Sequence, residues 1–137
     1  MRLSIYEAGL GIAVLCITSA TTFAETSYLC AINEVCECVA VTGCKHVSPK
    51  AANLAGVMVL DVEKKQLSLA PLGGRPRTDA IESLTVTDDA ILLYGTGKRK
   101  PNRTFSAVIS LKTGNLSAGV STLESSLALS GTCSSKP

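Results

Sequence analysis

Short segments of apolar or alternating apolar and polar residues recur along most of the chain. They follow one another about every 8 to 12 residues, separated by turn-forming residues, a spacing typical of antiparallel β proteins. Alternation is clearest in residues 56–62 and 104–111, where one set of side chains can face a core and the other water. The pattern therefore predicts an all-β domain, an antiparallel meander of about eight or nine short strands that forms a small barrel or sandwich.

The expected strands are joined by short connections, so neighbours in sequence are expected to pair up and down in the sheet. They cover residues 27–38, 44–47, 56–62, 66–70, 80–86, 91–94, 104–111, 115–121 and 127–133. Turns are expected at residues 72–74 and 112–114, among others, because these are rich in residues that accept turn geometry. A helix is possible only at residues 49–54, as a single turn after Ser48.

Residues 1–24 do not fit the β pattern. Arg2 gives a positive start, residues 10–17 are apolar, and residues 22–24 place small side chains on both sides of a phenylalanine. That order is typical of a secretory signal peptide, and the apolar stretch is shorter than the roughly 20 residues that span a bilayer. We expect one mature domain of residues 25–137 in the periplasm or outside the cell, with no transmembrane segment after signal cleavage.

The composition of this mature domain narrows its partners. Removal of Arg2 and Glu7 with the signal leaves 12 basic and 10 acidic residues, and the remaining aromatic residues are Tyr28, Tyr94 and Phe105. Nucleic-acid surfaces usually combine a strongly basic groove with aromatic side chains on which bases stack. We therefore expect no nucleic-acid partner.

The sequence also contains no familiar catalytic motif. It has no Gly-x-Ser-x-Gly elbow, phosphate-binding loop or His-Glu-x-x-His segment, and His46 is its one histidine. A thiol nucleophile at Cys36, activated by His46, is the remaining enzymatic hypothesis. The prediction is a non-enzymatic domain that needs no cofactor.

Five of the six cysteines remain after signal cleavage: Cys30, Cys36, Cys38, Cys44 and Cys133. Several cysteines in a small exported chain usually form disulfides, and an odd number leaves at least one unpaired within a monomer. Cys30 lies in the first expected strand and Cys133 ends the last. If the sheet closes on itself, these strands become neighbours, and a bridge between them would join the two ends of the domain.

Cys36, Cys38, Cys44 and His46 are symmetric about Val41. In a hairpin centred there, Cys38 faces Cys44, Cys36 faces His46, and all four side chains share one face. One interpretation is a Cys38–Cys44 disulfide that leaves Cys36 as a thiol able to link two chains. The other is a site with three cysteines and one histidine for zinc or Cu(I). An oxidising compartment favours the disulfide.

Turn and cysteine motifs are spread over most of the mature chain. They are residues 28–30, 37–38, 43–45 and 129–133, together with residues 105–109 followed by residues 113–116. This pattern resembles small uncharacterised exported proteins of Gram-negative bacteria, and the resemblance implies an envelope location and a β fold without implying an activity. In that pattern the cysteines that match Cys30, Cys38, Cys44 and Cys133 recur, whereas Cys36 is an addition. The resemblance thus favours two structural bridges and one extra thiol.

A basic segment near residue 100 is the remaining candidate for a partner contact. It contains Lys98, Arg99, Lys100 and Arg103, four of the 12 mature basic residues. A solvated hairpin loop is the ordinary interpretation of such a segment, and the functional one is contact with an acidic envelope partner. The sequence as a whole predicts an exported binding or inhibitor-like module, with metal binding by the Cys36, Cys38, Cys44 and His46 set as the alternative.

The mass of the exported protein tests the signal peptide and the cysteine chemistry together. We expect a chain that begins at Glu25 and is four hydrogens lighter than its fully reduced form, because two disulfides form in an oxidising compartment. Intact-mass spectrometry with and without reductant measures both. Retention of Met1, or an unchanged mass on reduction, would contradict the prediction.

Overall fold

The computed structural model describes residues 27–69, 77–97 and 102–136, which contain β-strands and turns but no helix. The strands are β1 (Ser27–Val39), β2 (Gly43–Val47), β3 (Val57–Asp61), β4 (Gln66–Leu69), β5 (Arg77–Ala80), β6 (Ser83–Val86), β7 (Ala90–Thr96), β8 (Thr104–Ser110), β9 (Asn115–Ser121) and β10 (Ser125–Ser135). The prediction of an all-β antiparallel domain is confirmed. The turn expected at residues 72–74 lies outside the described residues.

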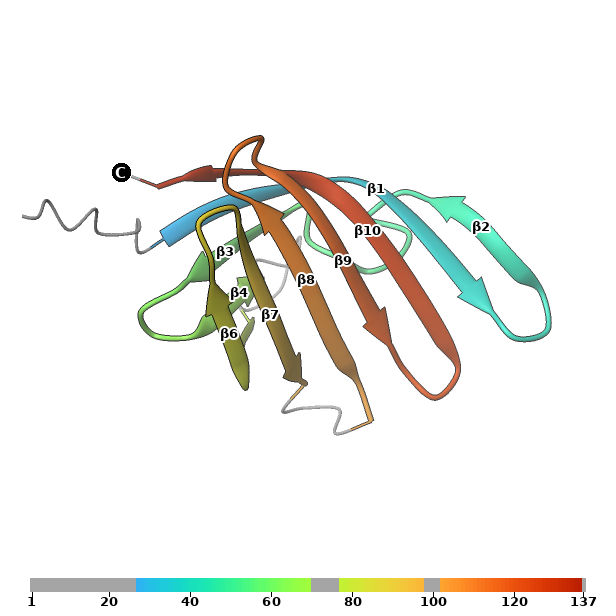
Figure 1. The fold of residues 1–137 in the computed structure, drawn as a ribbon. Coiled ribbons are helices and arrows are strands. Elements are labelled where there is room, and N and C mark those ends of the chain that lie inside the picture. The colour runs from blue at the N-terminus through green and yellow to red at the C-terminus, as the bar shows by residue number, and fades with distance from the viewer. Residues whose placement is uncertain (1–26, 70–76, 98–101, 137) are drawn as a thin grey trace, which may run out of the picture.

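Nine strands form one curled antiparallel sheet in the order β5-β4-β3-β1-β10-β9-β8-β7-β6, and β2 pairs with the second half of β1. The sheet bends into a half-barrel rather than splitting into the two layers of a sandwich (Figure 1). Hairpins account for most of the ladders. The exceptions are β1 with β3, which follows the β1–β2 hairpin, and β1 with β10, which joins the first strand to the last.

The two edges of this sheet, β5 and β6, are consecutive in the chain. Ile81 and Glu82 separate the two strands and bond to different parts of the sheet. The N–H of Ile81 donates to the Lys65 carbonyl at 2.9 Å, and the N–H of Glu82 donates to the Tyr94 carbonyl at 2.9 Å. The chain therefore turns a corner between β5, which pairs with β4, and β6, which pairs with β7. The single strand predicted over residues 80–86 is interrupted at this corner, because the backbone changes partner there: Ala80 ends β5, and β6 begins at Ser83.

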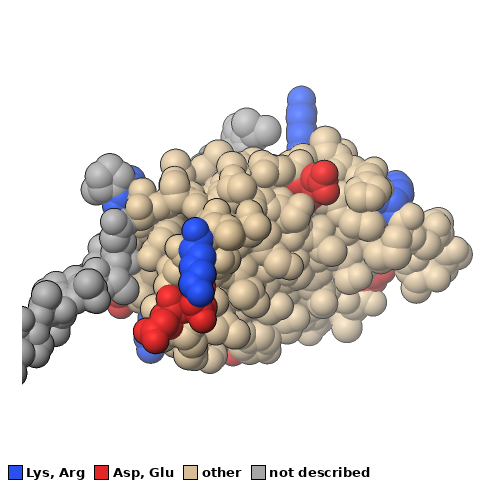
Figure 2. All heavy atoms as spheres, turned by 45° about the horizontal axis from the view of Figure 1, so that its top comes forward, with Lys and Arg blue, Asp and Glu red and all other residues tan. Residues whose placement is uncertain are grey.

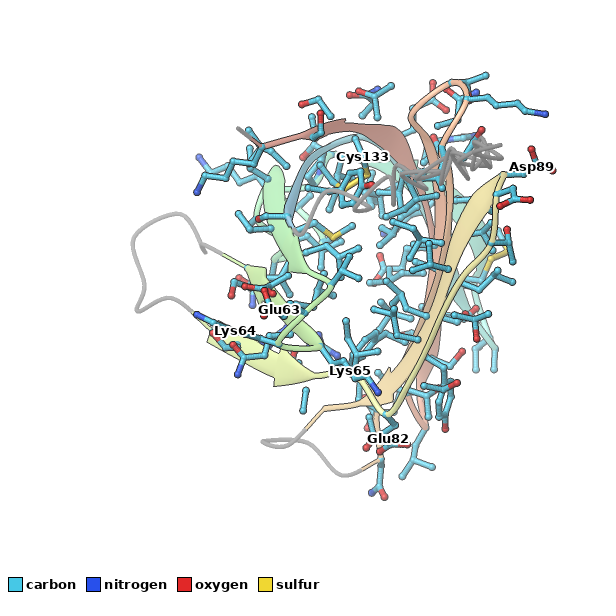
Figure 3. All side chains as sticks on the ribbon, turned by 60° about the vertical axis from the view of Figure 1, so that its left-hand side comes forward. Glu63, Lys64, Lys65, Glu82, Asp89 and Cys133 are labelled. Atoms are coloured by element: carbon cyan, nitrogen blue, oxygen red, sulfur yellow. A yellow bond between two sulfur atoms is a disulfide. The ribbon has the colours of Figure 1, made fainter. Side chains whose placement is uncertain are left out.

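The concave face of the sheet carries the core. On β8 the burial alternates strictly from residue to residue, as predicted for residues 104–111, and β7 shows the same alternation. The largest completely buried side chains are Leu60, Ile91, Ile109, Val35 and Cys30. Figure 3 shows aliphatic side chains filling the interior between the two halves of the curled sheet. Period-two patterning thus decides which side chains enter the half-barrel.

The segment between β2 and β3 contains the one helix-like turn that the sequence allows. The N–H of Ala52 donates to the Ser48 carbonyl at 3.1 Å, but the turn is not continued into a helix. Ala55 after it is buried, and the Gly56 carbonyl accepts a hydrogen bond of 2.9 Å from Ile32, at the irregularity in β1. This segment therefore packs against β1 and β3.

Gly131 provides a test of the β1–β10 ladder, because a Cβ at this buried position would overlap the carbonyl oxygen of Ala31. Substitution Gly131→Ala is expected to lower the free energy of unfolding by about 1 to 3 kcal/mol, the usual cost of overpacking. Urea unfolding measures it. Gly119→Ala in β9 is the matched control, since its nearest new contact would be an ordinary one at 3.8 Å. An equal loss in both variants would contradict this account of the ladder.

Candidate functional site

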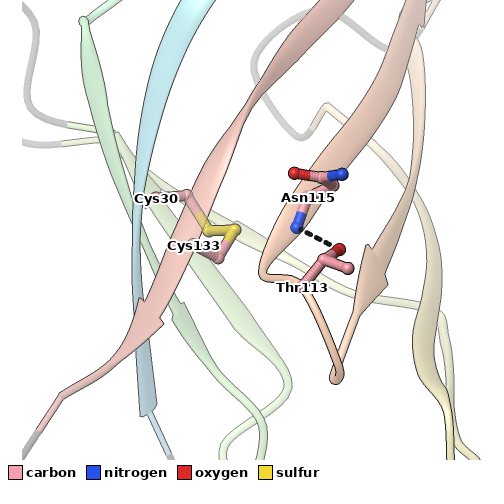
Figure 4. The surroundings of a disulfide bond; sticks show 4 residues. All are labelled: Cys30, Thr113, Asn115 and Cys133. Atoms are coloured by element: carbon pink, nitrogen blue, oxygen red, sulfur yellow. Dashed lines mark hydrogen bonds between the residues drawn. A yellow bond between two sulfur atoms is a disulfide. The ribbon is translucent and has the colours of Figure 1, made fainter.

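The first disulfide joins the ends of the fold. Cys30 in β1 lies directly opposite Cys133 in β10, and the structure bonds them across a sequence separation of 103 residues. Cys30 is completely buried. The turn before β9 lies beside the bridge (Figure 4): the N–H of Asn115 donates to Thr113 Oγ1 at 3.2 Å, and the N–H of Cys133 donates to the Gly114 carbonyl at 2.7 Å. The bridge therefore links β1 to a well-bonded part of the sheet.

The second disulfide lies at the mouth of the β1–β2 hairpin. The register pairs Cys38 with Cys44 and Cys36 with His46, as the symmetry about Val41 predicts. The structure bonds Cys38 to Cys44 and leaves Cys36 as a half-buried free thiol beside the exposed His46. The bridge uses two of the four donors in the metal hypothesis. Among the described residues no group of three His, Cys, Asp or Glu side chains is placed to hold a metal ion.

Two hairpin tips project from the same end of the half-barrel. Val39 pairs with Ser125, so the turn between β1 and β2 lies next to the turn between β9 and β10 (Figure 1). The side chains at these tips are the most exposed large apolar ones in the described part of the chain: Val41 is 93% exposed and Leu123 is 83% exposed. The fold thus brings two apolar side chains, distant in sequence, to one end.

Both tips are held by local bonds. The Cys38–Cys44 disulfide closes the first across six residues, with Gly43 in the left-handed region at φ 78°. In the second, Thr122 Oγ1 accepts from the N–H of Ser125 at 3.0 Å and from that of Glu124 at 3.3 Å, while the Thr122 N–H donates to the Ser125 carbonyl at 2.9 Å. The exposed side chains therefore stand on ordered turns.

The surface seen in Figure 2 carries few charged side chains, and those it has are scattered. One exposed ion pair joins Lys112 Nζ to Asp89 Oδ1 at 2.7 Å. The neighbouring turn is ordered by Thr87, whose Oγ1 accepts from the N–H of Ala90 at 3.0 Å. The carboxylate of Asp89 is therefore paired with Lys112 beside an ordered turn.

A charged cluster, formed by Arg77, Asp79 and Arg103, lies inside the half-barrel. Asp79 in β5 is 2% exposed, and its Oδ2 lies 3.4 Å from Arg77 Nε and 3.8 Å from Arg103 Nη2. Arg103 was expected to be part of a solvent-exposed basic loop, but its side chain is only 14% exposed and turns inward to this carboxylate. Lys98, Arg99 and Lys100, the other predicted partner contacts, lie outside the described residues.

The electrostatics of this cluster are unbalanced. Burial lowers the pKa of the Arg103 guanidinium, the nearby Arg77 lowers it further, and Asp79 acts in the opposite direction. A shift of this sign means that the surroundings disfavour the charged form of the side chain. Burial is the largest cause of this shift, and in addition two guanidinium groups share the single carboxylate of Asp79.

The sequence pattern missed Arg77 and Asp79, because charged residues after a glycine-rich stretch are typical of a loop. Arg77, Asp79 and Ile81 alternate with exposed or half-exposed residues, but the apolar residues of the following strand, Leu84 and Val86, occupy positions of the opposite parity. No local pattern in the sequence therefore marks Asp79 as an inward-facing position. Opposite Arg77 and Asp79 on β4 lie Leu69 and Leu67, both buried.

Comparison of the chain with protein-family models, with curated proteins and with solved structures gives no match. The two disulfides indicate an oxidising, exported environment, because thiols inside cells are kept reduced. In the described residues no helix has the length and apolar character needed to cross a membrane.

The two bridges are expected to differ in their effect on stability. The chain-entropy model assigns about 4.7 kcal/mol to a loop of about 100 residues and about 2 kcal/mol to one of six. Replacing Cys30 and Cys133 by alanine should therefore lower the free energy of unfolding about twice as much as replacing Cys38 and Cys44. Denaturant unfolding measures both losses, with Cys36→Ala as the control. A larger loss from the hairpin bridge would contradict the prediction.

Proposed function

We propose that the chain is exported to the periplasm or the cell exterior, where it acts as a non-enzymatic, inhibitor-like module that binds another envelope protein. The proposed contact consists of Val41 and Leu123 at the neighbouring hairpin tips. The observation that carries the proposal is their exposure: the six other exposed large apolar side chains in the described residues are between 39% and 46% exposed, about half the values at the tips.

A projecting apolar tip suits a concave surface. Scattered apolar side chains on a sheet are ordinary, but two that stand almost free of their own fold contribute little to stability. Buried in a pocket of a partner, each would remove most of its apolar area from water, which stabilises a complex by about 1.5 to 3 kcal/mol per side chain. The matching partner is therefore a protein with an apolar cleft, such as the substrate cleft of an enzyme.

The disulfide at the β1–β2 mouth supports this proposal. β2 already forms a five-residue ladder with β1, so the disulfide adds most of its restraint at the turn that joins the two strands. A turn that is already ordered loses less conformational entropy when it binds, which strengthens association without any new contact. The Thr122 hydrogen bonds provide the same preorganisation for Leu123.

Substitution of both tips, Val41→Ser with Leu123→Ser, tests the proposal. We expect retention of the envelope partner on immobilised mature protein to fall at least about tenfold, since 1.4 kcal/mol corresponds to a factor of ten. Quantitative mass spectrometry of proteins captured from an envelope extract measures this. Unfolding should be unchanged, because both side chains lie outside the core.

The matched control removes two other exposed apolar side chains from outer strand positions, Val57→Ser with Val108→Ser. It makes the same kind of change at two exposed apolar side chains away from the tips, at about half the exposed fraction, and should retain the partner. If the tip variant and this control capture the same proteins in the same amounts, the hairpin tips are not the contact.

A further inference from the structure

One part of the barrel interior has an excess of positive charge. Asp79 is the only buried polar or charged residue in the described part of the chain. Arg77 and Arg103 approach the same atom, Asp79 Oδ2, at 3.4 Å and 3.8 Å. A single carboxylate balances one guanidinium, so the three side chains together carry one uncompensated positive charge.

The polar atoms of this cluster are also incompletely bonded. Arg77 Nε, Arg103 Nε and Asp79 Oδ2 are buried and have no hydrogen-bond partner among the described residues. Arg77 Nε and Asp79 Oδ2 face each other at 3.4 Å in an ion pair, so Arg103 Nε is the buried donor that lacks an acceptor among the described residues. Buried donors are almost always hydrogen-bonded in folded proteins, so this one points to an additional acceptor. For two guanidinium groups the fitting partner is an oxyanion, because arginine presents a planar set of donors that matches a carboxylate.

An apolar space adjoins the two charged groups. A cavity of about 30 Å³ is bounded by Asp79 and Arg103 at its polar side and elsewhere mainly by apolar side chains, including Leu67, Leu93 and Phe105. One water-sized probe needs about 10 to 15 Å³, so the cavity has room for a group of only a few atoms. The site therefore combines positive charge with a small apolar pocket.

We propose that Arg103, which lines the cavity, binds a monocarboxylate whose short apolar group enters the space lined by Leu67, Leu93 and Phe105, while Arg77 adds positive charge on the other side of Asp79. The carboxylate of Asp79 sets the charge of the ligand, because it reduces the site to one net positive charge and repels an anion of higher charge. The small cavity sets the size. This site is separate from the hairpin tips and does not depend on them.

Calorimetric titration of the disulfide-bonded mature protein with sodium acetate, butyrate, octanoate, inorganic phosphate and chloride tests the proposal. We expect saturable one-to-one binding of carboxylates, with butyrate tighter than acetate because its alkyl group enters the cavity. Phosphate and chloride should bind at least about tenfold more weakly than butyrate, a difference readily resolved in dissociation constants. Octanoate should bind more weakly than butyrate, because its alkyl chain is longer than the cavity can hold.

Variants locate the site. Arg103→Gln should weaken butyrate binding at least about tenfold. Arg77→Gln should weaken it less, because Arg77 is more exposed than Arg103 and does not line the cavity. Lys112→Gln is the matched control: it also removes one positive charge, but from an exposed ion pair in the turn after β8, whereas Arg103 lies directly before β8. Its affinity for butyrate should be unchanged.

Three results would overturn the proposal. The first is an absence of saturable carboxylate binding to the unsubstituted protein up to about 10 mM, which would mean that water alone completes the cluster. The second is tighter binding of phosphate or chloride than of butyrate. The third is an equal loss of affinity in Lys112→Gln and in the arginine variants, which would indicate nonspecific attraction to the whole charge of the protein.

Discussion

The pairing of β1 with β10 is the interaction on which the rest of the structure depends. Most other ladders arise from hairpins or from strands near each other in sequence, whereas this one joins the first strand to the last. Bringing distant segments together costs loop-closure entropy before the new contacts compensate for it. The buried Cys30–Cys133 bridge restrains the same pair of strands, so the covalent link lies where the entropic cost is greatest.

The corner between β5 and β6 brings the two edges of the sheet together, and it explains the position of the charged cluster. The chain passes from β5, which pairs with β4, to β6, which pairs with β7, through only two residues, and the inner face of β5 lies close to Arg103 at the start of β8. Arg77 and Asp79 occupy inner positions there, and Arg103 precedes β8. Burial of unequal charge disfavours the folded state unless partners complete it, which is why this cluster indicates binding rather than stability.

The hairpin tips and the interior cluster therefore have different physical character. The hairpin tips expose apolar side chains on ordered turns, a geometry suited to insertion into another protein. The interior cluster has incompletely bonded donors beside a small cavity, a geometry suited to a small anion. Neither feature is needed to fill the core, which Leu60, Ile91, Ile109 and Val35 complete without them.

Local patterning in the sequence was sufficient to predict most of the strands, the facing pairs Cys36 with His46 and Cys38 with Cys44, and the neighbouring positions of Cys30 and Cys133 in a closed sheet. The strands and the hairpin pairs follow from period-two alternation and hairpin symmetry, which depend on residues close in sequence, whereas the pairing of Cys30 with Cys133 also required the assumption that the first and last strands meet. Three other features depend on how the sheet curls and where its edges meet: the inward orientation of Arg103, the burial of Asp79, and the position of Val41 and Leu123 at the same end. Only the tertiary structure decides these, because the curvature of a sheet is set by all its strands together and not by any one segment.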